Sequence, residues 1–194
     1  TAALIYGVAP DDVSPEMREV LAKMKGKTFK SYEGYFPGGW GTVIADAMRI
    51  NLGSFAIDLR CFDRRVENWQ EVDGYDPPTC LSCSESPMGE PLNCNAKKAT
   101  ARLVGERITG VEIVSDRIES TGKTAAVIDV ALVIRTRRIV YTFSRGVWFD
   151  LNIYPRVGDE IDIPYTVEEC AEDWAEGTDE NETPARVKRT VIAL

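Results

Sequence analysis

The cysteines are the residues whose spacing most clearly suggests chemistry. Cys80 and Cys83 form a C-x-x-C pair, and Cys94 follows them in a stretch rich in proline, serine and glycine. A structural zinc ion takes four ligands, commonly from two such pairs. Cys61 supplies the fourth thiolate if its strand ends near this stretch. We therefore expect a structural zinc site at Cys80, Cys83, Cys94 and Cys61, without a base that would activate a zinc-bound water.

Two other interpretations of these cysteines stay open. A disulfide from Cys94 to Cys80 or Cys83 would stabilise the loop by about 3 kcal/mol, but it requires an oxidising compartment. The cysteines could also form no bond at all. A redox pair is disfavoured, because such a pair normally lies at the N-terminus of a helix, whereas two prolines precede Cys80 here.

The sequence contains no histidine. Ser-His-Asp and Cys-His catalysis, and every acid-base step that needs an imidazole, are therefore excluded. Asp129 interrupts an apolar run, and burial could raise the pKa of its carboxyl group toward neutrality. It could equally pair with an arginine from the RTRR that follows. The sequence therefore favours a protein that is not an enzyme and that has no cofactor other than zinc.

The net charge of −8 is concentrated in one segment. Residues 168–182 hold eight acids and neither lysine nor arginine, so acids and bases balance over the remainder. General nucleic-acid binding needs a concentration of basic residues, which this distribution does not provide. A basic protein partner fits the acidic segment better, unless the segment is only a solvated helix face. The candidate partner-binding acids are Glu168, Glu169, Glu172 and Asp173.

A second candidate for partner binding is the aromatic and glycine-rich stretch at residues 32–41, YEGYFPGGWG. Tyrosine and tryptophan dominate many protein interfaces, which makes Tyr35, Phe36 and Trp40 candidate contact residues. The alternative is a turn whose aromatic side chains fold back onto the core.

Two segments have helical signals. Residues 14–25 begin with Ser14 as a possible N-cap and Pro15 at the first helical position, and Gly26 follows them as a possible C-cap. Residues 166–174 begin with Thr166 and Glu169, which have the spacing of a capping box. We expect the first helix to pack on a sheet and the second to carry the acidic residues.

Most of the remaining sequence has the alternation of β-strands. Apolar and polar residues alternate in 54–62, 137–143 and 147–153, while 127–134 is nearly all apolar and is typical of a strand covered on both faces. Further strands are expected at 101–105, 110–116, 159–163 and 186–193. Because no helix-length spacers separate the strands from 101 to 163, neighbouring strands should pair antiparallel.

These elements predict an α+β fold that is mainly antiparallel β. We expect one twisted sheet or a partly closed β-barrel, with an N-terminal helix packed on one side and a short acidic helix near the C-terminus. Residues 1–194 should form a single domain with a Cys/Pro-rich loop insertion at residues 74–100. The sequence shows no internal repeat.

The sequence thus favours a small, soluble, cytoplasmic protein that works by binding another protein through its acidic face and its aromatic-glycine loop. An inhibitor or immunity-type protein is the concrete form of this hypothesis. The alternative is a β-barrel that binds a small molecule in an internal pocket or acts on it by carboxylate chemistry. A structural part of a larger assembly is a third possibility. No apolar run reaches the roughly 18 residues of a spanning helix, so we do not expect a membrane as partner. The charge distribution likewise gives no reason to expect a nucleic acid.

Overall fold

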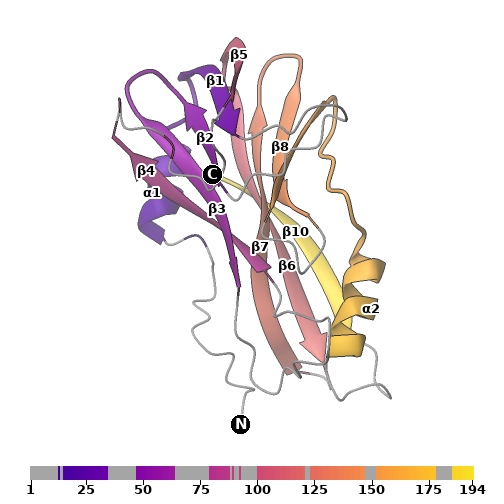
Figure 1. Ribbon diagram of the computed structural model, residues 1–194. Coiled ribbons are helices and arrows are strands. Elements are labelled where there is room, and N and C mark those ends of the chain that lie inside the picture. Colours follow the sequence, from indigo (N-terminus) through magenta and orange to yellow (C-terminus); the bar gives the residue numbers. More distant parts are fainter. Residues whose placement is uncertain are drawn as a thin grey trace.

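The fold consists of two antiparallel β-sheets with two short helices (Figure 1). The computed structural model describes residues 13, 15–34, 47–63, 79–87, 89, 92, 100–120, 123–146, 152–177 and 185–194. Helix α1 (Pro15–Ala22) precedes the first sheet, and α2 (Val167–Gly177) lies between the last two strands. Neither described helix is long and apolar enough to cross a membrane.

The first sheet has the strand order β4-β3-β2-β1-β5. Its strands are β1 (Thr28–Gly34), β2 (Ala47–Asn51), β3 (Ala56–Asp63), β4 (Thr79–Ser86) and β5 (Thr100–Arg107). The second sheet has the order β10-β6-β7-β8-β9. Its strands are β6 (Gly110–Ser120), β7 (Lys123–Arg135), β8 (Val140–Arg145), β9 (Ile153–Gly158) and β10 (Arg186–Ala193).

Both sheets have the same connectivity. Four consecutive strands form an up-and-down meander, and the fifth strand returns to pair with the first strand of its meander. This repetition is topological, and the sequence gives no sign of it. All first-sheet strands precede all second-sheet strands in the chain.

The prediction of a mainly antiparallel β fold is confirmed, since every strand pair is antiparallel. The prediction of one twisted sheet or a partly closed barrel is corrected to two sheets. The reason is the two-residue link between β5 and β6. Ile108 donates its N–H to the carbonyl of Lys27, which directly precedes β1 of the first sheet, whereas the next residue, Thr109, donates to Arg135 at the end of β7 in the second. The chain therefore changes sheets at a bend that the strand pattern alone does not reveal.

The two sheets pack face to face through an aromatic cluster. Phe29 and Tyr32 of β1 meet Tyr141 and Phe143 of β8, with ring centroids 5.0 Å apart for Phe29 and Tyr141 and 5.4 Å for Tyr32 and Phe143. Both contacts are edge-to-face, the arrangement that the ring quadrupoles favour. Side chains of the first core cluster, which also includes Leu21 from α1, therefore fill the space between the sheets.

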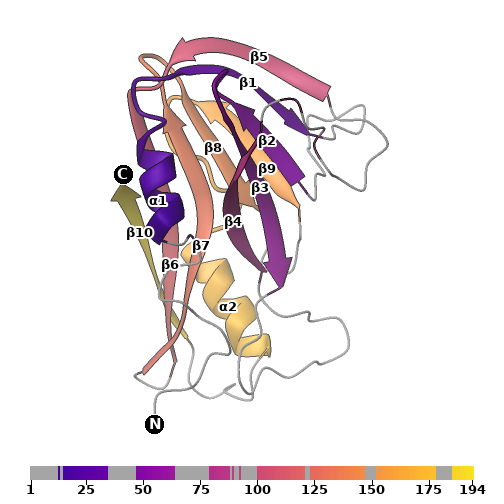
Figure 2. The ribbon, with the colours of Figure 1, turned by 90° about the vertical axis from the view of Figure 1, so that its left-hand side faces the viewer.

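The opposite face of the second sheet is also covered. Along β7, Leu132 and Ile134 belong to the core between the sheets, while Ala131 and Val133 belong to a second cluster that includes Tyr165 and Cys170. This two-sided burial explains why residues 127–134 are almost all apolar. Helix α1 contacts β4, and α2 contacts β10 (Figure 1), while Figure 2 shows α1 next to β7.

Two segments differ from the sequence-based expectation. Residues 79–86, assigned to a loop insertion, form β4, because β3 supplies a partner along its whole length. Residues 159–163, expected as a strand, form no regular structure. Ile161 and Ile163 still pack against the second cluster while their acidic neighbours are exposed, so the alternation is present without strand pairing.

Candidate functional site

The structure divides the predicted cysteine ligands between two faces. Cys83 on β4 and Cys61 on the neighbouring β3 both pack against the core between the sheets. Cys80 lies three positions before Cys83 on the same strand, so its side chain points to the opposite face, and it belongs to the second cluster. A strand thus separates the two thiols of the C-x-x-C pair, whereas a zinc knuckle needs a tight turn that brings them together.

The described cysteines do not assemble a metal site. Within the described ranges, no three Cys, Asp or Glu side chains gather as a group that could hold a metal ion. Burial is the main cause that raises the pKa of the Cys83 thiol well above its usual range, and the nearby Asp129 carboxylate adds to this effect. Because zinc binds the thiolate, the raised pKa disfavours Cys83 as a zinc ligand. Cys61, Cys80 and Cys83 are present as thiols. Cys94 lies outside the described residues, so the zinc and disulfide hypotheses that include it stay predictions.

The aromatic candidates Tyr35, Phe36 and Trp40 also lie outside the described residues. Tyr32, at the start of the same stretch, is a core residue of β1. Their role in partner binding stays a prediction.

The acidic candidates lie on α2. Glu168, Glu169 and Glu172 are exposed. Asp173 lies within the bounds of α2, but its side chain is outside the described part. The segment leading from β9 to α2 descends along one side of the molecule (Figure 1) and adds further exposed carboxylates. Together these acids form what we call the acidic strip: Asp159, Glu160, Asp162, Glu168, Glu169 and Glu172.

The acidic strip groups carboxylates that lack ion pairs with any described residue. None of its six carboxylates forms an ion pair within the described part of the chain. By contrast, six carboxylates elsewhere pair with arginines: Glu33, Asp58, Glu112, Asp116, Glu119 and Asp129. Among the described residues, the negative charge of the strip is therefore not neutralised by an ion pair.

Helix α2 begins with a capping box. The Thr166 N–H donates to Glu169 Oε2 at 2.6 Å, and the Glu169 N–H donates to Thr166 Oγ1 at 3.2 Å. These are the two bonds that the Thr-x-x-Glu spacing suggested. Glu169 therefore has a structural role. Within the described residues, Glu168 and Glu172 form neither a hydrogen bond nor an ion pair with another side chain, and they lie one helical turn apart.

A buried ion pair fastens α2 to the second sheet. Asp116 on β6 is fully buried and accepts two hydrogen bonds from Arg189 on β10, from Nε at 2.7 Å and Nη2 at 2.8 Å. Arg189 also donates to the Tyr165 carbonyl at 3.0 Å, and the Cys170 thiol of α2 donates to Asp116 at 3.9 Å. Burial alone would lower the pKa of Arg189, but the hydrogen-bonded Asp116 carboxylate holds it above its usual value.

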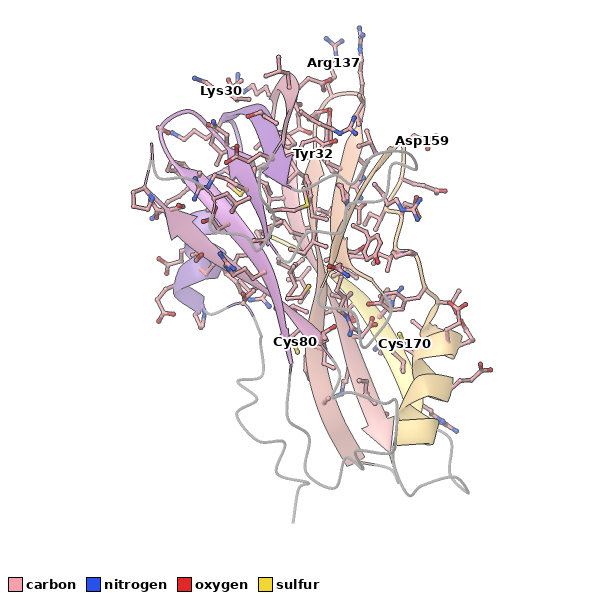
Figure 3. All side chains as sticks on the ribbon, viewed as in Figure 1. Lys30, Tyr32, Cys80, Arg137, Asp159 and Cys170 are labelled. Carbon is pink, nitrogen blue, oxygen red and sulfur yellow. The ribbon has the colours of Figure 1, made fainter. Side chains whose placement is uncertain are left out.

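Tyr165, just before α2, is held between two guanidinium groups. The Arg145 and Arg189 carbons lie 5.2 and 5.1 Å from its ring centroid, within the range of cation–π attraction. Arg145 is fully buried at the end of β8 and donates to the Thr79 carbonyl at 2.7 Å, which connects the cluster to β4. Figure 3 shows Cys80 and Cys170, the thiols near this cluster, in the lower half of the molecule.

The Tyr165 hydroxyl is buried without a hydrogen-bond partner among the described residues. Burial raises the pKa of Tyr165, although Arg145 opposes the shift. The phenol is therefore neutral at pH 7. This neutral ring lies within cation–π distance of two guanidinium groups at the start of α2.

Asp129, the buried carboxylate singled out in the sequence, is a structural anchor. It accepts hydrogen bonds from the Val13 N–H at 2.8 Å, from Arg18 at 3.3 Å and from the Ser115 hydroxyl. The arginine partner comes from α1 rather than from residues 135–138. Asp129 thus ties α1 to β7, a role that leaves its carboxylate fully engaged.

Sequence reasoning missed two groups of residues at this site. Asp159, Glu160 and Asp162 looked like part of a strand, although their net charge could have marked them as an extension of the acidic segment. Arg145, Tyr165 and Arg189 carry no local signal, because an isolated basic or aromatic residue in a strand pattern does not reveal a buried cluster.

Comparison of the chain with protein-family models, with curated proteins and with solved structures returned no match.

Proposed function

We propose that this protein is a non-enzymatic binding protein that engages a basic protein partner through its acidic strip. The observation that supports the proposal is the set of six exposed carboxylates without ion pairs, in a chain whose other described acids are mostly paired with arginines. Unpaired like charges on one surface attract a partner of opposite charge and accelerate its association.

The rigidity of the surface also supports this function. The capping box and the contacts of Tyr165, Cys170 and Arg189 fix α2 on the second sheet. A preformed surface loses less conformational entropy on binding than a flexible one. An inhibitor or immunity-type protein, which covers a cationic site of its target, is the concrete form that we propose. The aromatic-glycine loop remains part of this proposal as a second contact region.

The test compares matched pairs of neutralised acids. The strip variant carries Glu168→Gln and Glu172→Gln, and its control carries Glu19→Gln and Glu85→Gln, which removes the same charge from exposed sites elsewhere. Each protein is immobilised and exposed to a lysate of the source cells at low and at high salt, and the retained proteins are quantified by mass spectrometry.

We expect at least one basic protein to be retained by the wild type and the control but depleted about fivefold or more by the strip variant, since two lost surface interactions at 0.5 kcal/mol each give that order of change. Raising the salt from about 0.05 to 0.5 M should release the same protein, because exposed charges are screened over a few ångströms. The proposal fails if the strip variant and the control retain the same proteins in equal amounts.

A further inference from the structure

Four strands lie at the edges of the two sheets, and three of them have features that hinder pairing with another chain. In β5, Gly105 has a φ of +76° at a shift in register with β1, which marks a β-bulge. In β9, Pro155 lacks an N–H. Helix α1 lies against β4 (Figure 1).

The fourth edge strand, β10, has neither a bulge nor a proline, although α2 contacts it as α1 contacts β4. It pairs with β6 in an unbroken register from Arg186 opposite Glu119 to Ala193 opposite Glu112. It contains neither proline nor glycine, and half of its residues are β-branched. None of its eight residues is fully buried. Helix α2 contacts the face of this strand pair through Cys170 and Asp116, so the strand keeps its place at the edge.

The backbone groups of β10 alternate between β6 and the outside. The Leu194 N–H, directly after the strand, donates to Val111 at 3.0 Å. Counting back in steps of two, Ile192, Thr190 and Lys188 also direct their backbone groups at β6. The N–H and C=O groups of Val187, Arg189, Val191 and Ala193 therefore point away from the sheet, at the spacing that an added strand requires.

The exposed charges of β10 are basic, in a chain with a net charge of −8. Arg186 and Lys188 are exposed and share one face of the strand. On the same face of β6, the charges of Arg117 and Glu119 cancel in an ion pair. Arg186 and Lys188 therefore give this group of four side chains a net positive charge. A second copy would not supply the missing carboxylates, because a full antiparallel overlap of residues 186–194 sets Lys188 opposite Ile192 and Arg186 opposite Leu194.

We propose that β10 is the docking edge for an extended acidic segment of a partner protein, which adds a sixth strand to the second sheet. Main-chain hydrogen bonds to Val187, Arg189, Val191 and Ala193 provide the pairing, and carboxylates opposite Arg186 and Lys188 provide the selectivity. This surface is separate from the acidic strip, and the proposal does not depend on the function proposed above.

The first experiment tests the charges. A fluorescent peptide with alternating glutamate and valine residues, capped by glycines, is titrated with the protein and followed by fluorescence anisotropy. Arg186→Glu with Lys188→Glu should weaken binding about tenfold or more, since two attractions become repulsions. The matched control is Arg137→Glu with Arg138→Glu, two exposed arginines in the turn between β7 and β8. Figure 3 shows Arg137 at the end opposite Cys80. The control should keep its affinity within twofold.

The second experiment tests the backbone pairing and leaves the protein unchanged. N-methyl groups are placed on alternate amides of the peptide in two complementary series. A peptide paired as a strand uses only every second N–H, so one series should abolish binding and the other should retain it. A peptide with lysine in place of glutamate should not bind.

Several results would overturn the proposal. The first is the absence of binding at about 1 mM peptide, a concentration at which even a Kd of that order gives a signal. The second is equal binding of the lysine peptide, and the third is an equal effect of the two N-methyl series on binding. A wild-type dimer in light scattering that Val191→Pro converts to a monomer would also overturn it, because the edge would then belong to a second copy of the chain.

Discussion

Substitution of Asp116 by asparagine provides the most direct test of the buried cluster beneath α2. The change keeps the shape of the side chain but removes its charge, so Arg189 loses the carboxylate that accepts two of its hydrogen bonds. The Asp116 side chain is fully buried, and that of Arg189 is 20% exposed. Removal of one partner from a buried pair costs about 3–5 kcal/mol, and the partial hydration of Arg189 places the expected loss near the lower limit, at about 3 kcal/mol.

The matched control is Glu119→Gln, three residues further along β6. Glu119 pairs with Arg117 at 3.2 Å, but the side chains are 47% and 52% exposed. Such a pair contributes about 0.5 kcal/mol or less, because water and salt screen it. The same chemical change on the same strand therefore separates the effect of burial from the effect of losing a carboxylate.

The assay is thermal and urea unfolding followed by circular dichroism. For a chain of this size, about 3 kcal/mol lowers Tm by roughly 6–12 °C, whereas the control should shift it by about 2 °C or less. Adding Arg189→Met to Asp116→Asn should recover part of the loss, because no unpaired cation is then buried. If Asp116→Asn costs no more than Glu119→Gln, or if the second substitution recovers nothing, the assignment of the ion pair as the anchor of α2 is wrong.

Two further perturbations follow from the same contacts. Tyr165→Phe removes a buried hydroxyl that has no hydrogen-bond partner among the described residues, so stability at pH 7 should be unchanged or higher by about 1 kcal/mol. Because burial raises the pKa of Tyr165 in the folded state, the wild type should lose stability as the pH rises above about 10. Urea unfolding at pH 8 and at pH 11 should therefore show a smaller loss of stability for the variant than for the wild type. Asp129→Asn removes the negative charge that binds Arg18 and the Val13 N–H. Hydrogen exchange of the backbone amides in residues 15–22 should therefore accelerate more than exchange in β8. Equal protection of residues 15–22 in the variant and the wild type would contradict the anchoring role of Asp129.

Local signals in the sequence predicted local structure well. Thr166 and Glu169 form reciprocal hydrogen bonds because a capping box needs only residues three apart. The apolar run at 127–134 reflects burial on both faces of β7. In both cases a local pattern carries the signal, although the side chains that cover β7 come from distant parts of the chain.

Features that depend on distant partners were not predictable. Strand β4 consists mainly of serine, cysteine and threonine, and it is ordered by pairing with β3 rather than by its own composition. The segment 159–163 has the alternation of a strand but no neighbouring strand to pair with. The placement of Arg145, Tyr165 and Arg189 in one cluster requires three elements to meet, and none of these residues differs in its local sequence from an exposed one.

The order in which the sheets occur along the chain has a consequence for synthesis on the ribosome. The first sheet is complete at Arg107, but Tyr141 and Phe143 of β8, which cover it, are made about 35 residues later. At ~5–20 residues per second, the apolar face around Phe29 and Tyr32 stays uncovered for roughly 2–7 s. The nascent first half is therefore the form of this protein most in need of a chaperone.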